Sequence, residues 1–258
     1  MPAKRLCVFA FTALLMGSGV AAVAHAAVTS TTTDVQVRRI GTDDLQLALG
    51  NSSVSLQLVA PGVLHVHYAP GGRATPPCLI IDPRPASPPK LAARWQRDGD
   101  TVTLRSARLV ATWHKRTRRL TLTNAQGHLL LQQADLAALE QGRIVLDHAK
   151  SDALYGIGGY EANQPVTAGL LRSGMQVAQA GKQGHPGAPF VWSTAGYGVL
   201  VDCGGARFDL ADGRITITGY VRPDADYYLM VGTPEPPRES RRLFGVSQAA
   251  MARPALCR

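Results

Sequence analysis

The feature that most constrains the fold is a series of short runs rich in Val, Leu and Thr, each ended by residues that favour turns. Antiparallel strands joined by hairpins produce this pattern. Residues 101–106 alternate with a period of two, which indicates a strand with one buried face. Strands are expected over residues 54–58, 63–68, 101–104, 109–113, 120–123 and 129–132, with turns at 50–51, 61–62, 98–100, 124–127 and 212–213. The sequence therefore predicts a mostly β fold, an antiparallel β-sandwich.

The first 26 residues have the pattern of a secretory signal peptide. Lys4 and Arg5 form a positive region, residues 6–16 are apolar, and residues 24–26 supply an A-x-A cleavage site. Residues 17–19 interrupt the apolar run before it reaches the roughly 20 residues that a membrane span needs. We expect cleavage after residue 26, export to the periplasm or the extracellular space, and no stable membrane insertion.

The remaining chain divides into a sandwich over residues 27–235 and a short segment over 236–258. Six prolines between residues 76 and 89 remove backbone donors, which predicts a surface connection there. Residues 132–141 are compatible with two or three helical turns. A short C-terminal helix is expected over 237–251.

Charge and cysteine content exclude some function classes. The formal charge is +9, or +7 once Lys4 and Arg5 leave with the signal. The densest basic cluster, residues 114–119, separates two expected strands and has no interleaved aromatics, so we interpret it as a hairpin turn and expect no nucleic-acid partner. The exported chain would keep Cys78, Cys203 and Cys257, whose spacing suggests neither a redox motif nor a zinc site.

Four segments occur in an order that resembles a known family. They are LYGIGGYE at residues 154–161, PFVWSTAGYGVLVD at 189–202, FD at 208–209 and DYYLMVGTPE at 226–235. Together they resemble the region that precedes the catalytic barrel in family 31 glycoside hydrolases, which include α-glucosidases and α-xylosidases. The resemblance implies a galactose-mutarotase-like β-sandwich and a carbohydrate-related function. The residues themselves allow a plainer account, in which the glycines form bends and Trp192 and Tyr197 are core residues.

A polar, glycine-rich loop over residues 172–188 holds the predicted substrate-binding residues. In relatives the matching loop reaches over the mouth of the barrel, which implies that Lys182, Gln183 and His185 contact an oligosaccharide or glycoside. Many relatives have an acidic residue in this loop and this chain has none. A solvated loop without a sugar partner is the alternative.

Catalytic residues and cofactors are not predicted. The family's two carboxyl groups come from the barrel, and none of the three tryptophans precedes an aspartate in a W-x-D motif. Asp43, Asp44, Asp209 and Asp212 fall at turns or strand ends, where solvated acids are common. His65 and His67 share one face of a strand and could bind a metal, but no third ligand is indicated, so we expect no metal site.

Three hypotheses therefore stay open at the level of sequence. The chain is the inactive amino-terminal sandwich of an exported α-glycosidase that ends before the barrel, a stand-alone carbohydrate-binding or scaffold module, or an enzyme with unrecognised chemistry. In the first case a separately encoded barrel is a partner. The surface around Phe190, Trp192 and residues 243–244 would then face water in the isolated chain, and we expect it to promote self-association.

Overall fold

The computed structural model describes residues 35–72, 91–157, 170–180, 188–202, 205–219 and 224–232. All of them belong to one compact unit, Thr33–Arg258. The expected signal peptide, the proline-rich connection, the C-terminal helix and the three cysteines at 78, 203 and 257 lie outside the described residues. In the part of the chain that is described, no helix is both long and apolar enough to span a membrane.

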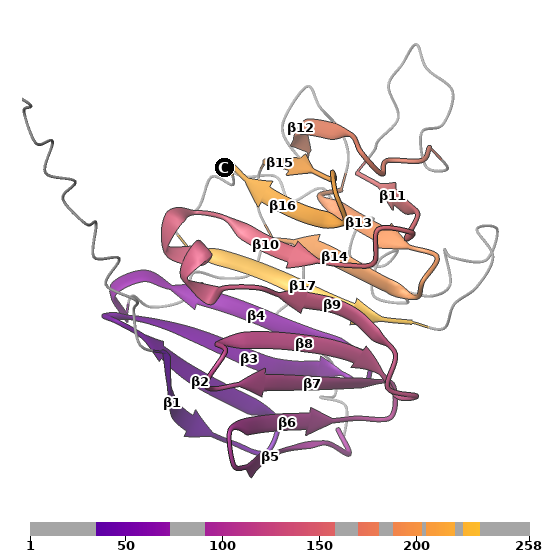
Figure 1. The fold of residues 1–258 in the computed structure, drawn as a ribbon. Helices are drawn as coiled ribbons and strands as arrows, with labels where there is room; N and C mark the ends of the chain where they lie inside the picture. Colours follow the sequence, from indigo (N-terminus) through magenta and orange to yellow (C-terminus); the bar gives the residue numbers. More distant parts are fainter. Residues whose placement is uncertain are drawn as a thin grey trace, which may run out of the picture. The chain divides into compact units, whose positions relative to one another are not determined.

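The described residues form two antiparallel sheets that face each other (Figure 1). From edge to edge, the eight-stranded sheet contains β1 (Val35–Ile40), β2 (Asp44–Leu49), β3 (Ser52–Ala60), β4 (Val63–Ala69), β17 (Ala225–Val231), β14 (Tyr197–Val201), β13 (Phe190–Ser193) and β11 (Leu154–Gly156). The nine-stranded sheet contains β12 (Gln176–Ala180), β15 (Ala206–Asp209), β16 (Arg214–Thr218), β10 (Ile144–Asp147), β9 (Leu129–Gln133), β8 (Arg119–Asn124), β7 (Leu109–His114), β6 (Thr101–Arg105) and β5 (Arg94–Asp98). The predicted β-sandwich is confirmed.

All six strands expected from the apolar runs are present, as β3, β4, β6, β7, β8 and β9, with ends that extend by up to two residues. The turns at 61–62 and 98–100 join β3 to β4 and β5 to β6. The expected helical turns begin later than predicted: residues 132 and 133 belong to β9, and a 3₁₀ helix, η2, spans Leu136–Gln141. The carboxylate of Asp135 caps it by accepting the Ala137 N–H at 2.9 Å.

The core lies between the sheets and follows the two-residue period. In β17, Ala225, Tyr227, Leu229 and Val231 point into the main core. Tyr228 and Met230, on the opposite face of the same strand, belong to a second and smaller apolar cluster. Every residue of β17 is buried. This strand is therefore covered on both faces, which is why its sequence is apolar with little alternation.

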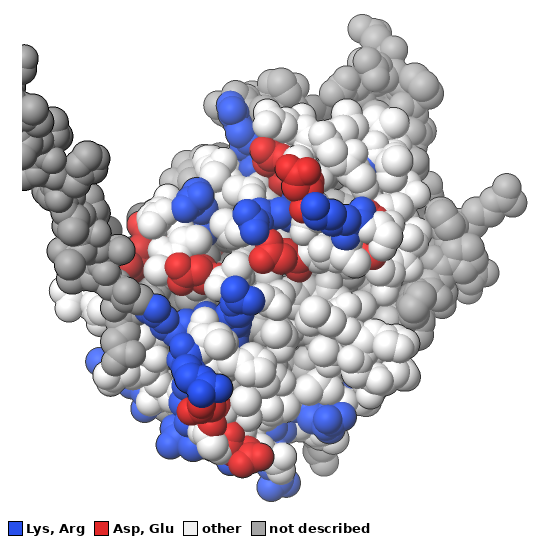
Figure 2. Space-filling view, viewed as in Figure 1, with Lys and Arg blue, Asp and Glu red and all other residues white. Residues whose placement is uncertain are grey.

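The basic cluster at residues 114–119 is the turn between β7 and β8, as predicted. Lys115 donates to the carbonyl of Gly99, and Arg116 lies 3.7 Å from the exposed Asp100 carboxylate. Figure 2 shows Lys and Arg interspersed with Asp and Glu on this side of the molecule. The positive charges therefore lie on a solvated hairpin turn.

Candidate functional site

Strand β4, strand β17 and the residue just before β17 bring four polar side chains together on the outer face of the eight-stranded sheet. The two strands are antiparallel neighbours, with His67 opposite Asp226 and His65 opposite Tyr228. Because side chains alternate along a strand, His65 and His67 share a face with Asp224 and Asp226. We call these four residues the sheet cluster.

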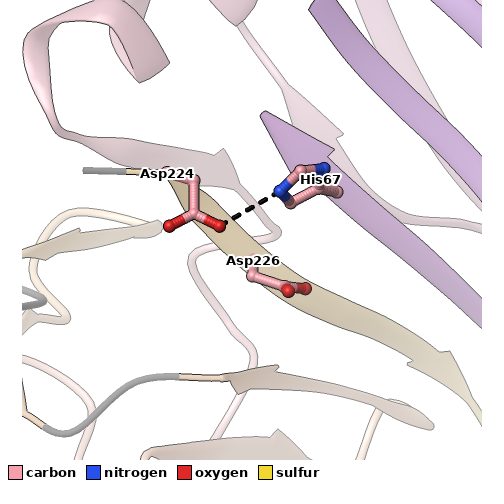
Figure 3. A group of neighbouring side chains, drawn as sticks. All are labelled: His67, Asp224 and Asp226. Atoms are coloured by element: carbon pink, nitrogen blue, oxygen red, sulfur yellow. Dashed lines mark hydrogen bonds and ion pairs between the residues drawn. The ribbon is translucent and has the colours of Figure 1, made fainter. Parts of the chain in front are cut away.

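The sheet cluster is held by two diagonal histidine–aspartate contacts. His65 Nε2 lies 2.5 Å from Asp226 Oδ1. His67 Nε2 lies 3.1 Å from Asp224 Oδ2, the contact drawn as a dashed line in Figure 3. The side chains of His67, Asp224 and Asp226 are 5%, 4% and 2% exposed, whereas His65 is 18% exposed. Water therefore reaches the cluster chiefly at His65.

Three of these residues also converge on a common point. One ligand atom each of His67, Asp224 and Asp226 lies within 4.8 Å of the other two. An imidazole nitrogen with two carboxylate oxygens is a donor set that transition-metal ions accept. The sequence indicated no third ligand for His65 and His67. In the structure, Asp226 of β17 and Asp224 just before it lie on the same face as the two histidines.

A small aromatic and apolar cluster lies next to the sheet cluster on this face. The His65 ring stacks on Tyr228 at 4.5 Å between centroids, and Tyr155 stacks on Trp192 at 4.8 Å. Trp192 is 9% exposed, and Phe190 and Tyr155 are half-buried. The expectation that the surface around Trp192 faces water is therefore wrong for Trp192 itself, because its ring packs within the second apolar cluster, beside Leu200 and Met230.

A third histidine–aspartate contact lies in the loop that follows β10. His148 Nδ1 lies 3.7 Å from Asp152 Oδ2, and the Tyr197 hydroxyl donates to the same carboxylate oxygen at 3.1 Å. The His148 Nδ1 atom also lies 2.8 Å from the carbonyl oxygen of Ala149, to which it can donate. We call His148, Asp152 and Tyr197 the loop cluster.

The environment of Tyr197 disfavours its ionised form. The side chain is fully buried in the main core. Burial raises the pKa of the Tyr197 hydroxyl well above its ordinary value, and the nearby negative charge of Asp152 raises this pKa further. Tyr197 therefore stays neutral and acts as a hydrogen-bond donor that anchors the loop.

A separate hollow of about 740 Å³ is lined by parts of β5 and β6 and by Thr42. Its described lining includes Arg94, Gln96, Arg105 and Ser106, and none of the described lining residues is an acid or a histidine. These residues can donate hydrogen bonds.

The predicted sugar-contacting residues Lys182, Gln183 and His185 lie outside the described residues, so they stay predictions. The start of their loop is described. Arg172 is buried and donates to the backbone carbonyls of Gly156 and Ile157 at 3.2 and 3.5 Å. Close by in the sequence, Leu170, Leu171 and Met175 are exposed by 45%, 50% and 38%.

The bend predicted for the YG-x-G segment is present. Gly156 has a φ of +93°, and a Cβ at this position would lie 2.4 Å from the carbonyl oxygen of Phe190. A side chain is therefore excluded twice, by backbone conformation and by space. The 189–202 segment forms the β13–β14 hairpin, which places Trp192 opposite Gly198.

Known proteins were compared with the chain by sequence and by structure. No family model matches the sequence. The 1,6-α-glucosyltransferase of Sporosarcina globispora is 28% identical over 219 residues, which cover 75% of this chain and 16% of that protein. A soil-metagenome GH31 α-xylosidase solved with xylose has a TM-score of 0.61 at 17% identity, over 76% of this chain and 32% of its own.

The GH31 dextranase of Flavobacterium johnsoniae, solved with isomaltotriose, also has a TM-score of 0.61, at 16% identity. The match covers 78% of this chain and 26% of the dextranase. The fold is that of part of a family 31 glycoside hydrolase. The resemblance predicted from the motifs is confirmed. At these identities it establishes the fold, and the chain spans at most about a third of each of these relatives.

Sequence reasoning missed the acidic half of the sheet cluster, although a signal was present. His65 and His67 stand two residues apart in an apolar strand, and so do Asp224 and Asp226. Polar pairs with this spacing, inside strands that otherwise read as buried, indicate a polar patch on one sheet face. The sequence alone does not indicate that the two strands are neighbours.

Proposed function

We propose that this chain provides the non-catalytic sandwich of a protein that cleaves or transfers α-linked glucosyl or xylosyl units. The observation that carries the proposal is the match of about three quarters of the chain to one part of family 31 enzymes. Those relatives are described as a xylosidase and a dextranase, and the relative with 28% identity as a 1,6-α-glucosyltransferase. The α-1,6-glucosyl class is therefore the first to test.

The residues on the outer face of the eight-stranded sheet favour a non-catalytic role for the sandwich. Asp224 and Asp226 are close enough to suggest a carboxylate pair, but both are buried and each contacts a histidine. A retaining glycosidase needs a nucleophile and an acid/base that reach the sugar.

Exposed apolar residues near the start of the 172–188 loop also favour a supporting role, in contact with another domain. Leu170, Leu171 and Met175 present apolar surface within six residues of sequence. Clustered apolar surface of this kind is typical of contacts between domains. We propose that this edge of the sandwich meets a catalytic barrel, as the resemblance to family 31 implies.

A chimera tests the proposal directly. Residues 35–232 of this chain would replace the matching segment of the Sporosarcina globispora 1,6-α-glucosyltransferase, and glucosyl transfer would be compared with that of a version lacking the segment. We expect the chimera to retain activity well above that of the deletion. Activity no higher than that of the deletion, in a chimera that folds, would contradict the supporting role.

A matched pair of substitutions sharpens this test. Leu171→Ser in the chimera removes exposed apolar surface at the proposed contact, and we expect it to lower transfer several-fold. Leu129→Ser is the control, because Leu129 is also exposed, by 59%, but lies at the start of β9 in the nine-stranded sheet. Equal effects of both substitutions would argue against a contact at Leu171.

A stand-alone carbohydrate-binding module is the second candidate, favoured by the stacked pair of Tyr155 and Trp192. Aromatic faces with nearby polar groups are common in ligand sites. Titration of the isolated chain with isomaltotriose and with xylose distinguishes this candidate. Saturable binding that Tyr155→Ala abolishes would favour the module, and the absence of binding would favour the supporting domain.

A further inference from the structure

We propose that His67, Asp224 and Asp226 form a binding site for one divalent transition-metal ion, and that zinc is the ion best matched to the site. The proposal goes beyond the carbohydrate function and does not depend on it. It rests on the convergence of three ligand atoms, the nature of these atoms, and the support they receive from neighbouring side chains.

The spacing of the three ligand atoms suits a small ion. Zinc binds histidine nitrogen and carboxylate oxygen at about 2.0–2.2 Å, so two ligands at a tetrahedral angle lie about 3.3–3.5 Å apart. His67 Nε2 and Asp224 Oδ2 are already 3.1 Å apart, and no pair in the set exceeds 4.8 Å. Small side-chain rotations on fixed strands would complete the coordination.

The donor types select the class of metal. Calcium and magnesium prefer oxygen ligands, six or more in number, and magnesium keeps several waters. A histidine nitrogen with two carboxylates instead suits zinc and its neighbours in the first transition series. Two carboxylates and a neutral imidazole would also balance the double charge of the ion, which favours its binding in a buried position.

Neighbouring groups hold the proposed ligands in place. Asp226 is contacted by His65 at 2.5 Å, and His65 in turn stacks on Tyr228. Carboxylate ligands in metal sites are commonly oriented by such second partners. His65 is also the most exposed member of the sheet cluster, so it marks the side from which an ion would enter.

The backbone of the site is pre-organised because every ligand sits on or beside a paired strand. β17 is hydrogen-bonded to β4 on one side and to β14 on the other. The two ligand-bearing segments are separated by 157 residues between His67 and Asp224. A bound ion would therefore cross-link distant parts of the chain and stabilise the folded state.

Zinc titration of the whole chain, after removal of metal with a chelator, tests the proposal. We expect one equivalent of Zn²⁺ to bind, and the melting temperature to rise by about 5 °C or more when zinc exceeds its Kd about 100-fold. Mg²⁺ and Ca²⁺ are expected to produce no comparable rise. A chain whose melting temperature does not respond to zinc would overturn the proposal.

Substitutions locate the site. Asp224→Asn and His67→Gln are expected to weaken zinc binding by well over tenfold, and His65→Gln by about tenfold through the loss of a positioning contact. His148→Gln and Asp152→Asn are the matched controls in the loop cluster and should leave the Kd unchanged. Unaltered zinc affinity in the folded Asp224→Asn chain would show that zinc binds elsewhere, for example at a cysteine.

A measurement on the unsubstituted chain covers the case in which the variants do not fold. Copper binds nitrogen and oxygen ligand sets more tightly than zinc does. With ascorbate as reductant and dissolved oxygen as oxidant, bound copper oxidises side chains next to the ion. Peptide mass spectrometry should find oxidation at His67 or His65 that excess zinc suppresses. Oxidation confined to other histidines, or unaffected by zinc, would contradict the site.

Discussion

The sheet cluster and the loop cluster both combine histidine with aspartate, yet they differ in what their surroundings allow. In the sheet cluster two carboxylates face two imidazoles across paired strands, and three ligand atoms converge. In the loop cluster one carboxylate meets one imidazole at 3.7 Å and accepts a hydrogen bond from Tyr197. The same residue types thus form a potential ion site in one place and a loop anchor in the other.

The difference teaches that the number of acids and the rigidity of the backbone matter more than the presence of histidine. Asp152 accepts a hydrogen bond from Tyr197, and His148 can donate to the adjacent carbonyl of Ala149. The sheet cluster has two carboxylates, Asp224 and Asp226, and both are almost fully buried. Buried charges of this kind require close compensation.

The largest expected effect separates the clusters by stability. Asp226→Ala removes a 2%-exposed carboxylate and leaves His65 without its partner, so we expect the free energy of unfolding to fall by about 3–5 kcal/mol. Asp152→Ala should cost about 1–2 kcal/mol, because Asp152 is 14% exposed and loses mainly one hydrogen bond. Urea unfolding of both variants, in metal-free buffer, measures the two values. Equal losses of unfolding free energy would show that the two clusters contribute equally to stability, contrary to this prediction.

An intermediate effect concerns the alkaline stability of the loop cluster. The pKa of Tyr197 is raised by burial and by Asp152, so the folded chain keeps this proton while the unfolded chain releases it near pH 10. The contribution of Tyr197 to the free energy of unfolding is therefore complete below pH 10. Above pH 10, the loss of this contribution lowers the free energy of unfolding by about 1.4 kcal/mol per pH unit.

Tyr197→Phe should therefore cost about 1–2 kcal/mol at pH 7, through the lost hydrogen bond to Asp152. Its unfolding free energy should also decline less steeply than that of the unsubstituted chain between pH 10 and pH 11. Denaturant unfolding at pH 7, 10 and 11 provides the comparison. Parallel pH profiles for the two chains would mean that Tyr197 ionises in the folded state as readily as in the unfolded state.

The smallest expected effect concerns the histidines. His148→Gln should change the free energy of unfolding by less than about 1 kcal/mol, because Nε2 of His148 is buried without a hydrogen-bond partner. His65→Gln keeps a donor near Asp226 but loses the stacked ring on Tyr228, so a loss of about 1–2 kcal/mol is expected. Thermal unfolding of the two variants should therefore rank His148→Gln as the milder. The reverse order would show that the loop cluster carries more of the stability.

The strands and hairpins could be predicted from the sequence because their causes are local. Alternating residues in 101–105 define a half-buried strand, and the glycine and proline turns define where β3 and β5 end. The glycine at 156 likewise reflects a local need, a left-handed backbone with a φ of +93°. These features involve neighbours in the sequence or a single turn.

The sheet cluster was decided only by tertiary structure. His65 and His67 could be placed on one strand face, and Asp226 within a recognisable segment, but nothing local states that β4 pairs with β17. That pairing depends on burying both faces of β17 between two apolar clusters, which is a property of the whole sandwich. The sequence by itself therefore determined the strands, the bends and the family resemblance. Long-range packing determined which polar side chains meet, because apolar burial aligns strands more than 150 residues apart.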